Sequence, residues 1–266
     1  MQKTVFIGAG NMAEALAAGM LAKGMTSPQA IRMTDVSPER LAHAAEKYGV
    51  ETMADNALAV ADAGMIVLAV KPQVFPEVRA EVVDALPAEA TVVSIMAGVP
   101  TASIAGDLPL RVVRAMPNTP ALAGAGAAGV APGEYATEID VKRTLEMMRA
   151  VGRAVVVREE QMDAVTALSG SGPAYVFLLL EGMLEAAERM GLDGGTAREL
   201  ALATVGGAAR LMEESGEEAE ALRRRVTSKG GTTEAALNRM EARGVKEAIV
   251  EALLAAQARS RELANG

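Results

Sequence analysis

Two segments that are rich in glycine and hydroxyl side chains could bind an anionic group of a substrate. They are Leu168–Tyr175 and, further along the chain, Thr227–Ala235. Each is expected to open a helix, where backbone N–H groups are available to a carboxylate or phosphate. Ser and Thr are also common helix N-caps, so capping alone could explain either segment. Because two such segments follow a dinucleotide-type N-terminus, we favour a carboxylate pocket.

A glycine motif near the N-terminus could bind a dinucleotide. Gly8–Ala13 reads G-x-G-x-x-A, between an apolar run at Thr4–Ile7 and a helical stretch at Asn11–Lys23. In such a turn the first glycine permits a tight bend, the second lets a pyrophosphate approach the backbone, and the last small residue allows close helix packing. A glycine turn that serves packing alone is the alternative.

Asp35 is the candidate for reading the cofactor's ribose, since it follows the second expected strand, Ile31–Thr34. A carboxylate at this place accepts from ribose hydroxyls and repels a 2′-phosphate, which favours NADH. Asp35 could equally cap the helix that begins at Pro38. Arg40, one turn into that helix, could instead meet a phosphate, so the cofactor preference stays open.

Two later segments are expected at strand ends on the same edge of the sheet. They are Ala69–Gln73 and Ser94–Gly98. Ligands of open α/β sheets bind outside the carboxyl ends of the strands, so these segments could line the nicotinamide half of a crevice. Lys71 could contact a cofactor oxygen there, or it could simply be an exposed lysine at a turn.

The apolar pattern divides the chain into two predicted domains. Short apolar runs alternate with helical stretches up to residue 158, which predicts an α/β domain of Rossmann type with a mainly parallel sheet. From 159 to 266 only helical stretches follow, which predicts an all-α domain. The expected strands are Thr4–Ile7, Ile31–Thr34, Met65–Val70, Thr91–Ser94, Arg111–Ala115 and Ala154–Val157, and the expected helices are Asn11–Lys23, Pro38–Tyr48, Phe75–Ala85, Thr137–Val151, Gln161–Leu168, Pro173–Met190, Thr196–Glu214, Glu218–Val226, Thr233–Arg243 and Val245–Leu263.

Composition excludes several kinds of chemistry. The 266 residues contain no Cys, which excludes a disulfide framework, a thiolate metal site and a cysteine nucleophile. Redox chemistry would therefore need a bound cofactor, and we expect no metal. The net charge of −8 argues against nucleic-acid binding. The only histidine, His43, lies in a surface-helix pattern and is not expected to be catalytic.

The chain is expected to be soluble and cytoplasmic, without a membrane partner. Its first residues lead directly into a strand rather than into the apolar core of a signal peptide. The longest apolar run, Ala174–Leu180, is far shorter than the roughly 20 residues that span a bilayer.

The helix expected at Pro173–Met190 is apolar on nearly all sides in its first half. Such a helix must be covered on more than one face, either inside its own subunit or by a second subunit. Gly206 and Gly207, inside another expected helix, cost stability unless a further backbone packs closely there. Both features predict tight helix packing.

Five segments occur in order from end to end of the chain: Gly8–Ala15, Val70–Gln73, Arg114–Pro120, Ser169–Tyr175 and Gly230–Ala235. Together they closely resemble pyrroline-5-carboxylate reductases. The first segment is shared by many dehydrogenases, whereas the last two together are specific to this family.

The resemblance implies NAD(P)H-dependent reduction of 1-pyrroline-5-carboxylate to L-proline, the last step of proline biosynthesis. It also implies a Rossmann domain followed by a helical domain that binds substrate and forms a homodimer, often assembled into decamers. Ser228 and the backbone of Gly231 and Thr232 would hold the carboxylate, and Thr233 would face the ring nitrogen as the catalytic residue. The expected cofactor contacts are Gly8, Ala9, Gly10, Asn11, Met12, Asp35, Asn56, Val70, Lys71, Pro72 and Ala97.

Two positions depart from the family pattern. Lys229 stands where the family usually has proline, so the substrate loop could be looser or its charge could attract the substrate. Asp35 stands where NADPH-preferring members tend to carry small polar or basic residues.

Two other functions are compatible with parts of the sequence. A 3-hydroxyacid dehydrogenase has a similar N-terminus, but it relies on a lysine in the helical domain, and the helix containing Gly172 and Pro173 has none. A dinucleotide-binding regulator without turnover needs only the first glycine motif. Oxidation of NAD(P)H with and without pyrroline-5-carboxylate separates these alternatives.

Overall fold

The computed structural model describes residues 2–265, which form two compact units. The N-terminal unit runs to Pro173 and takes in the C-terminal residues from Ala256, and the helical unit is Ala174–Ala255. The domain boundary expected between residues 158 and 159 stays a prediction.

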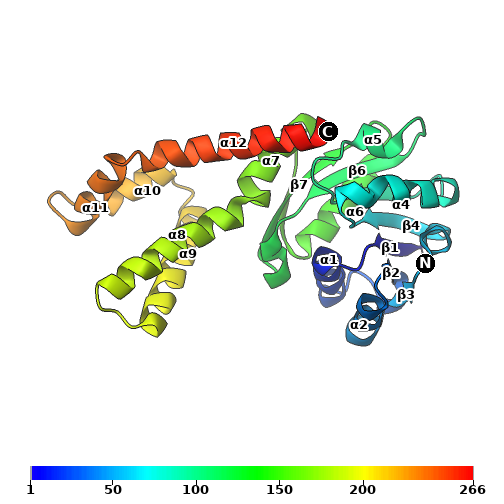
Figure 1. The fold of residues 1–266 in the computed structure, drawn as a ribbon, viewed down its shortest axis with the longest axis horizontal. Coiled ribbons are helices and arrows are strands. Elements are labelled where there is room, and N and C mark those ends of the chain that lie inside the picture. The colour runs from blue at the N-terminus through cyan, green and yellow to red at the C-terminus, as the bar shows by residue number, and fades with distance from the viewer. Residues whose placement is uncertain (1, 266) are drawn as a thin grey trace. The chain divides into compact units, whose positions relative to one another are not determined.

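The N-terminal unit is built on a sheet of eight strands in the order β3-β2-β1-β4-β5-β6-β7-β8 (Figure 1). The strands from β3 to β6 in this order are parallel, β7 runs antiparallel to β6, and β8 is parallel to β7. The strands are β1 Lys3–Ile7, β2 Ile31–Thr34, β3 Glu51–Met53, β4 Ala63–Leu68, β5 Thr91–Ser94, β6 Arg111–Met116, β7 Gly126–Pro132 and β8 Gly152–Val156.

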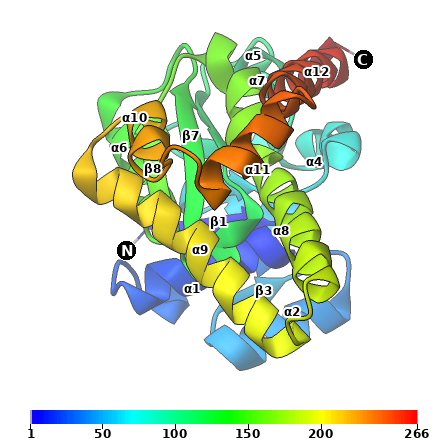
Figure 2. The ribbon, with the colours of Figure 1, turned by 90° about the vertical axis from the view of Figure 1, so that its left-hand side faces the viewer.

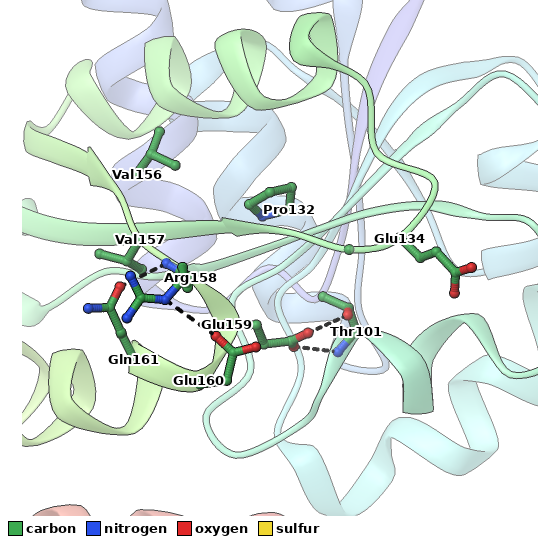
Figure 3. Close-up of a pocket in the computed structure, with 10 residues that line it drawn as sticks. Thr101, Pro132, Glu134, Val156, Val157, Arg158, Glu159, Glu160 and Gln161 are labelled. Carbon is green, nitrogen blue, oxygen red and sulfur yellow. Dashed lines mark hydrogen bonds and ion pairs between the residues drawn. The ribbon is translucent and has the colours of Figure 1, made fainter.

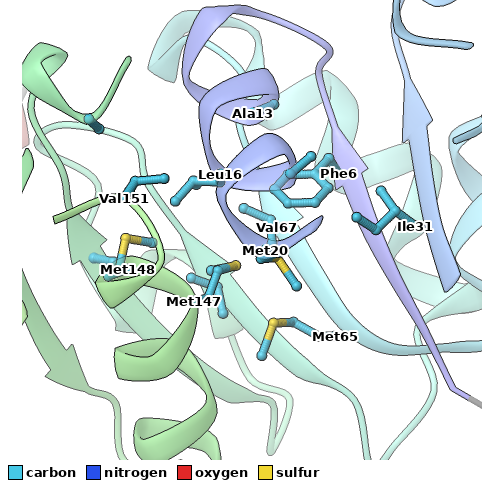
Figure 4. Close-up of a cluster of buried hydrophobic side chains, with 14 of the residues drawn as sticks. Phe6, Ala13, Leu16, Met20, Ile31, Met65, Val67, Met147, Met148 and Val151 are labelled. Carbon is cyan, nitrogen blue, oxygen red and sulfur yellow. The ribbon is translucent and has the colours of Figure 1, made fainter. Parts of the chain in front are cut away.

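Helices cover both faces of this sheet. Side chains of α1 and α6 pack with the strands on one face (Figure 4), together with those of α2. Side chains of α3, α4 and α5 pack on the other face. Few aromatic side chains take part, and Leu16, Met147 and Met148 fill much of the first core. The helices are α1 Asn11–Ala22, α2 Pro38–Tyr48, α3 Asn56–Val60, α4 Phe75–Val82, α5 Thr101–Ala105 and α6 Glu138–Arg149.

The six strands and four helices expected in this part of the sequence are confirmed within a few residues at their ends. Two strands were missed. β7 is rich in Gly and Ala and ends in Pro132, and Val130 is its single residue of the β-branched or aromatic types that signal a strand. β3 has only three residues, and its pairing with β2 defines it. In both cases the neighbouring strand supplies the stabilisation.

The first hydroxyl and glycine segment differs from the prediction, because it lies inside the helical stretch Glu159–Arg189 and not at its start. The helix α7, Met162–Val165, continues through a π-helical turn at Thr166–Gly170 into α8, Gly172–Arg189. We call Thr166–Gly170 the π-turn. The N–H of Ser171 donates to the carbonyl of Thr166 at 2.8 Å, and the hydroxyl of Ser169 donates to the carbonyl of Val165 at 3.0 Å. Ser169 therefore bonds backwards within the helix instead of capping it.

By length and composition alone, the helical stretch Glu159–Arg189 is long and apolar enough to cross a membrane. The expectation from the sequence considered only the uninterrupted apolar run. Glycine and serine interrupt that run without interrupting the helix, which makes the helical stretch longer.

The helical unit consists of helices, as predicted. α8 and α9 diverge from a tight turn at residues 190–193 (Figure 2), where Asp193 caps α9 by accepting from the N–H groups of Gly195 and Thr196. The remaining helices are α9 Gly194–Ser215, α10 Ala219–Arg225, α11 Thr232–Glu241 and α12 Val245–Asn265, the last of which ends in the N-terminal unit.

Much apolar surface of these helices is uncovered in the single chain. On α8, the side chains of Phe177 and Leu178 are 57% and 68% exposed. Apart from the neighbouring backbone of α9 itself, a Cβ built at Gly206 or Gly207 would meet no atom of the described residues within 4 Å. The close packing expected at these two glycines is therefore not made within one subunit.

Candidate cofactor and substrate sites

The glycine turn has the shape that a dinucleotide requires. Gly8 adopts a φ of +99°, and its N–H donates to the carbonyl of Thr34 at 2.8 Å. A Cβ on Gly8 would lie 2.7 Å from the carbonyl oxygen of Ala69, so only glycine fits there. Gly10 is the N-cap of α1 and makes no side-chain cap, and a Cβ built on it would meet nothing within 4 Å. The turn thus leaves open space in front of the first N–H groups of α1, which fits a pyrophosphate.

Asp35 contacts the glycine turn directly. Its Oδ2 accepts the N–H of Ala9 at 2.9 Å, and its Oδ1 accepts the N–H of Ser37 at 2.9 Å. The side chain of Asp35 is only 8% exposed. The alternative that Asp35 caps the next helix is wrong, because Ser37 is the N-cap of α2 and accepts from the N–H of Arg40. Asp35 instead joins the end of β2 to the glycine turn.

The opening beside Asp35 carries a positive charge and an apolar side chain. Arg40 Nη1 lies 3.5 Å from Asp35 Oδ2, and most of the Arg40 side chain is exposed. Val36 is 99% exposed. Arg40 partly neutralises the carboxylate that would repel a 2′-phosphate, and Val36 offers an apolar surface to a flat ring. The sequence reasoning did not single out Val36, although its place directly after Asp35 was a usable signal.

The loops after β4 and β5 continue the same edge of the sheet. The N–H of Ala69 donates to the carbonyl of Ile7 at 2.8 Å, and the N–H of Ile95 donates to the carbonyl of Leu68 at 3.2 Å. Side by side, the two loops expose Lys71 and Ala97 to solvent. The structure thus brings Gly8, Ala9, Gly10, Asn11, Met12, Val70, Lys71, Pro72 and Ala97 to one edge of the sheet.

Asn56, the other expected cofactor contact, is bonded to neighbours within the protein. Its Oδ1 accepts the hydroxyl of Thr34 at 2.6 Å, and its Nδ2 donates to Glu81 at 2.6 Å. Thr34 ends β2 next to the glycine turn, so Asn56 lies near this edge.

The second hydroxyl and glycine segment is a turn that opens α11 in the helical unit. Gly230 has a φ of +74°, and the N–H of Gly231 donates to the carbonyl of Ser228 at 3.0 Å. A Cβ built on Gly231 would lie 2.5 Å from the hydroxyl oxygen of Ser228, so that hydroxyl lies over the glycine. Since the Gly231 N–H is used inside the turn, the N–H groups of Thr232 and Thr233, in the first turn of the helix, are the better placed donors.

Thr233 is not the cap of α11. Gly231 occupies the N-cap position, and no side chain caps it. The alternative that Thr233 serves as an N-cap is therefore wrong, and its half-buried side chain is left for another role. Glu234 was missed by the sequence reasoning: its Oε2 accepts the N–H of Gly230 at 2.7 Å and holds the turn. The signal was an acidic residue in the first turn of a helix, which commonly bonds back to the preceding backbone.

Other candidate groups lie outside these two sites. His43 is half exposed on α2, with Nε2 3.4 Å from Glu14. A cavity of about 630 Å³ is lined by Glu134, Glu159 and Glu160, and Glu159 is bonded to Thr101 there (Figure 3). Within residues 2–265, no three side chains of His, Cys, Asp or Glu gather as a metal site would require.

A mainly parallel sheet with an open glycine turn after its first strand defines a dinucleotide-binding oxidoreductase of Rossmann type. Residues 3–98 match the family model "NADP oxidoreductase coenzyme F420-dependent", and residues 159–263 match "Pyrroline-5-carboxylate reductase dimerisation". A pyrroline-5-carboxylate reductase of Pseudomonas aeruginosa is 45% identical over 98% of this chain and 97% of its own length. The chain belongs to the pyrroline-5-carboxylate reductase family.

Two solved structures agree with this assignment. A pyrroline-5-carboxylate reductase from Coxiella burnetii has a TM-score of 0.92 and 41% identity, and each chain is covered to 98%. The enzyme of Plasmodium falciparum, solved with NADP bound, has a TM-score of 0.89 and 26% identity, covering 99% of this chain and 98% of its own.

Proposed function

We propose that this chain reduces 1-pyrroline-5-carboxylate to L-proline with NAD(P)H. The observation that carries the proposal is the turn before α11, where the hydroxyl of Ser228 lies over Gly231 and no side chain caps the first-turn N–H groups. Such a turn suits a small carboxylate, because the N-terminus of a helix attracts negative charge. Family membership then selects the substrate among small carboxylates.

The cofactor contacts are proposed along the edge that begins at the glycine turn. Bound there, a reduced nicotinamide supplies hydride. The first N–H groups of α1 would meet the pyrophosphate, Arg40 and Val36 the adenosine end, and the loops after β4 and β5 the nicotinamide end. The residues proposed are Gly8, Ala9, Gly10, Asn11, Met12, Asp35, Asn56, Val70, Lys71, Pro72 and Ala97.

The substrate contacts are proposed at the start of α11. Ser228 and the N–H groups of Thr232 and Thr233 hold the carboxylate. The N–H of Gly231, which the family resemblance also assigned to the carboxylate, donates to Ser228 within the turn, so Gly231 shapes the turn instead. The hydroxyl of Thr233 bonds the ring nitrogen. Hydride adds to C5 of the protonated imine, the C=N bond becomes C–N, and the nitrogen keeps its proton. Because an iminium accepts hydride readily, the protein mainly aligns the reactants.

A homodimer is proposed to cover the apolar face of α8 and the open side of α9. The segment that matches the dimerisation family model contains Phe177, Leu178, Gly206 and Gly207. A second copy can approach the glycines closely and bury the exposed side chains. The same proposal includes further assembly into a decamer. It also includes a soluble, cytoplasmic protein that binds neither nucleic acid nor a membrane. In this proposal the apolar stretch Glu159–Arg189 belongs to the interface between subunits.

The test is NAD(P)H oxidation by the full-length protein, followed at 340 nm, with and without pyrroline-5-carboxylate. We expect oxidation only with the imine and formation of proline in equal amount. Cofactor binding without turnover would replace the proposal with a regulatory role. Oxidation of 3-hydroxyacids with NAD(P)⁺, without imine reduction, would place the chain in another class of dehydrogenase.

A further inference from the structure

The end of β6 contacts the segment that leads into α8. Arg114 is buried, with Nη1 3.8 Å from Glu159 Oε1. Burial lowers the pKa of Arg114 from its usual value, and the charges of Glu159 and Asp163 partly oppose this effect. Glu159 in turn accepts from the N–H and the hydroxyl of Thr101 at 2.7 and 2.6 Å. The start of the segment is thus held near the sheet by an ion pair between a buried arginine and a half-buried glutamate.

Met116 and Asn118 continue the contact onto the π-turn. A Cβ built on Gly170 would lie 2.9 Å from Met116 Cε. Asn118 is 8% exposed, and its Nδ2 donates to the carbonyl of Ser169 at 2.9 Å while its Oδ1 accepts the N–H of Ala127 at 2.8 Å. Residues 114, 116 and 118 alternate along the chain, and these three positions contact Glu159, Gly170 and Ser169, at the two ends of the segment.

This contact lies at the edge of the sheet that carries the cofactor loops. β5 and β6 are parallel neighbours, and Ser94 pairs with Arg114. The loop after β5 contains Ala97, and the residues after β6 lead to Asn118, so both follow the carboxyl ends of adjacent strands. In open α/β sheets that is where the ligand lies. π-Turns inside helices are also frequent at functional sites.

We propose that Asn118 is a positioning residue for hydride transfer, because its amide holds the π-turn in place beside the nicotinamide half of the cofactor site. Both its carbonyl oxygen and its amide nitrogen are bonded to backbone, so it acts through the π-turn and not on the substrate. In this proposal the π-turn forms a wall of that half of the site, and its Leu168 is 67% exposed. The inference rests on the proposed reductase activity.

The deciding variant is Asn118→Asp. It keeps an acceptor for the Ala127 N–H but places a carboxylate oxygen, which cannot donate, against the carbonyl of Ser169. We expect kcat for the imine to fall about 10- to 100-fold, as for displacements of about 1 Å in other active sites. The dissociation constants of NADH and NADPH, measured by fluorescence titration, should change less than about 2-fold, since the glycine turn is untouched.

Two further variants separate positioning from stability. Asn118→Ala removes both hydrogen bonds and should lower kcat and the melting temperature together. Asn118→Ser introduces no charge, and its side chain is too short to reach the carbonyl of Ser169. If Asn118→Asp does not fold, Asn118→Ser carries the same expectation for kcat.

Wild-type turnover is the reference for each outcome. An active wild type with a folded Asn118→Asp protein of unchanged kcat overturns the positioning role. A folded Asn118→Ser protein with unchanged kcat does the same where Asn118→Asp does not fold. A wild type that oxidises no cofactor with the imine refutes the proposed function instead.

Discussion

The carboxylate of Asp35 accepts the backbone N–H of Ala9, with an Oδ2 to N distance of 2.9 Å. This bond ties the acid that ends β2 to the turn where a pyrophosphate would bind. Asp35, the candidate for reading the ribose, therefore holds the glycine turn, and Arg40 balances its charge.

Replacing Asp35 should have two separable effects. Asp35→Ser removes the acceptor for the Ala9 N–H, so both NADH and NADPH should bind less tightly. It also removes a negative charge near the 2′-phosphate position, which Arg40 already partly balances, so the ratio of kcat/KM for NADPH to that for NADH should rise by roughly 5-fold, about 1 kcal/mol.

Arg40→Ala provides the matched control for that experiment. It leaves the bond to Ala9 in place and removes only the positive charge, so the same ratio should fall. An unchanged ratio in both variants would show that neither residue takes part in cofactor choice.

Thr233→Val tests the proposed partner of the imine nitrogen. The branched shape is kept and the hydroxyl, which accepts from the N–H of the protonated imine, is lost, so kcat/KM for the imine should fall by roughly 10- to 1,000-fold, as for the loss of other positioned hydrogen-bonding groups. Cofactor affinity should hardly change. Because Gly231 is the N-cap, the melting temperature should also stay close to that of the wild type. Normal kinetics would remove Thr233 from the mechanism.

Leu178→Glu tests the dimer. The wild type should sediment as a dimer or larger at micromolar concentration, and the variant should shift toward monomer, because a charge would be buried in the interface. Ile139→Glu is the control, since Ile139 is 62% exposed on α6 in the N-terminal unit. A wild-type monomer, or equal sedimentation of the two variants, would contradict the proposed interface.

Asp140 should contribute to stability in a pH-dependent way. It is 2% exposed; burial pushes its pKa up, but hydrogen bonds from Thr137 and Thr91 outweigh burial, and the net pKa is lowered. The folded state therefore favours the carboxylate. This stabilisation is full above the ordinary pKa of 3.8 and is lost as the pH falls through the lower pKa of the folded state.

Asp140→Asn measures this contribution. At pH 7 the variant should lose roughly 1 to 3 kcal/mol of unfolding free energy, because it exchanges a carboxylate acceptor for an amide. The difference from the wild type should shrink as the pH falls below about 4. Glu138→Gln, an exposed change in the same first turn of α6, should cost much less. A difference that does not depend on pH would contradict the assignment.

Local patterns in the sequence determined the glycine turn, most helices and the strongly apolar strands. A G-x-G-x-x-A turn needs only neighbouring residues, and the helix at Pro38–Tyr48 is bounded as its periodicity and proline predict. The substrate turn before α11 is local as well, because Ser228, Gly231 and Glu234 act within one turn of each other.

Tertiary structure alone decided the partners of Asp35 and Asn118 and the strand β7. Asp35 meets Ala9 across 26 positions and Asn118 meets Ser169 across 51, and a hydrogen bond over such a separation depends on strand order, which no local pattern encodes. β7 pairs with β6 although its own residues disfavour a strand. The Ser169–Pro173 segment folds as a π-turn and helix because backbone bonds and the contact with Asn118 outweigh the turn preference of its glycines.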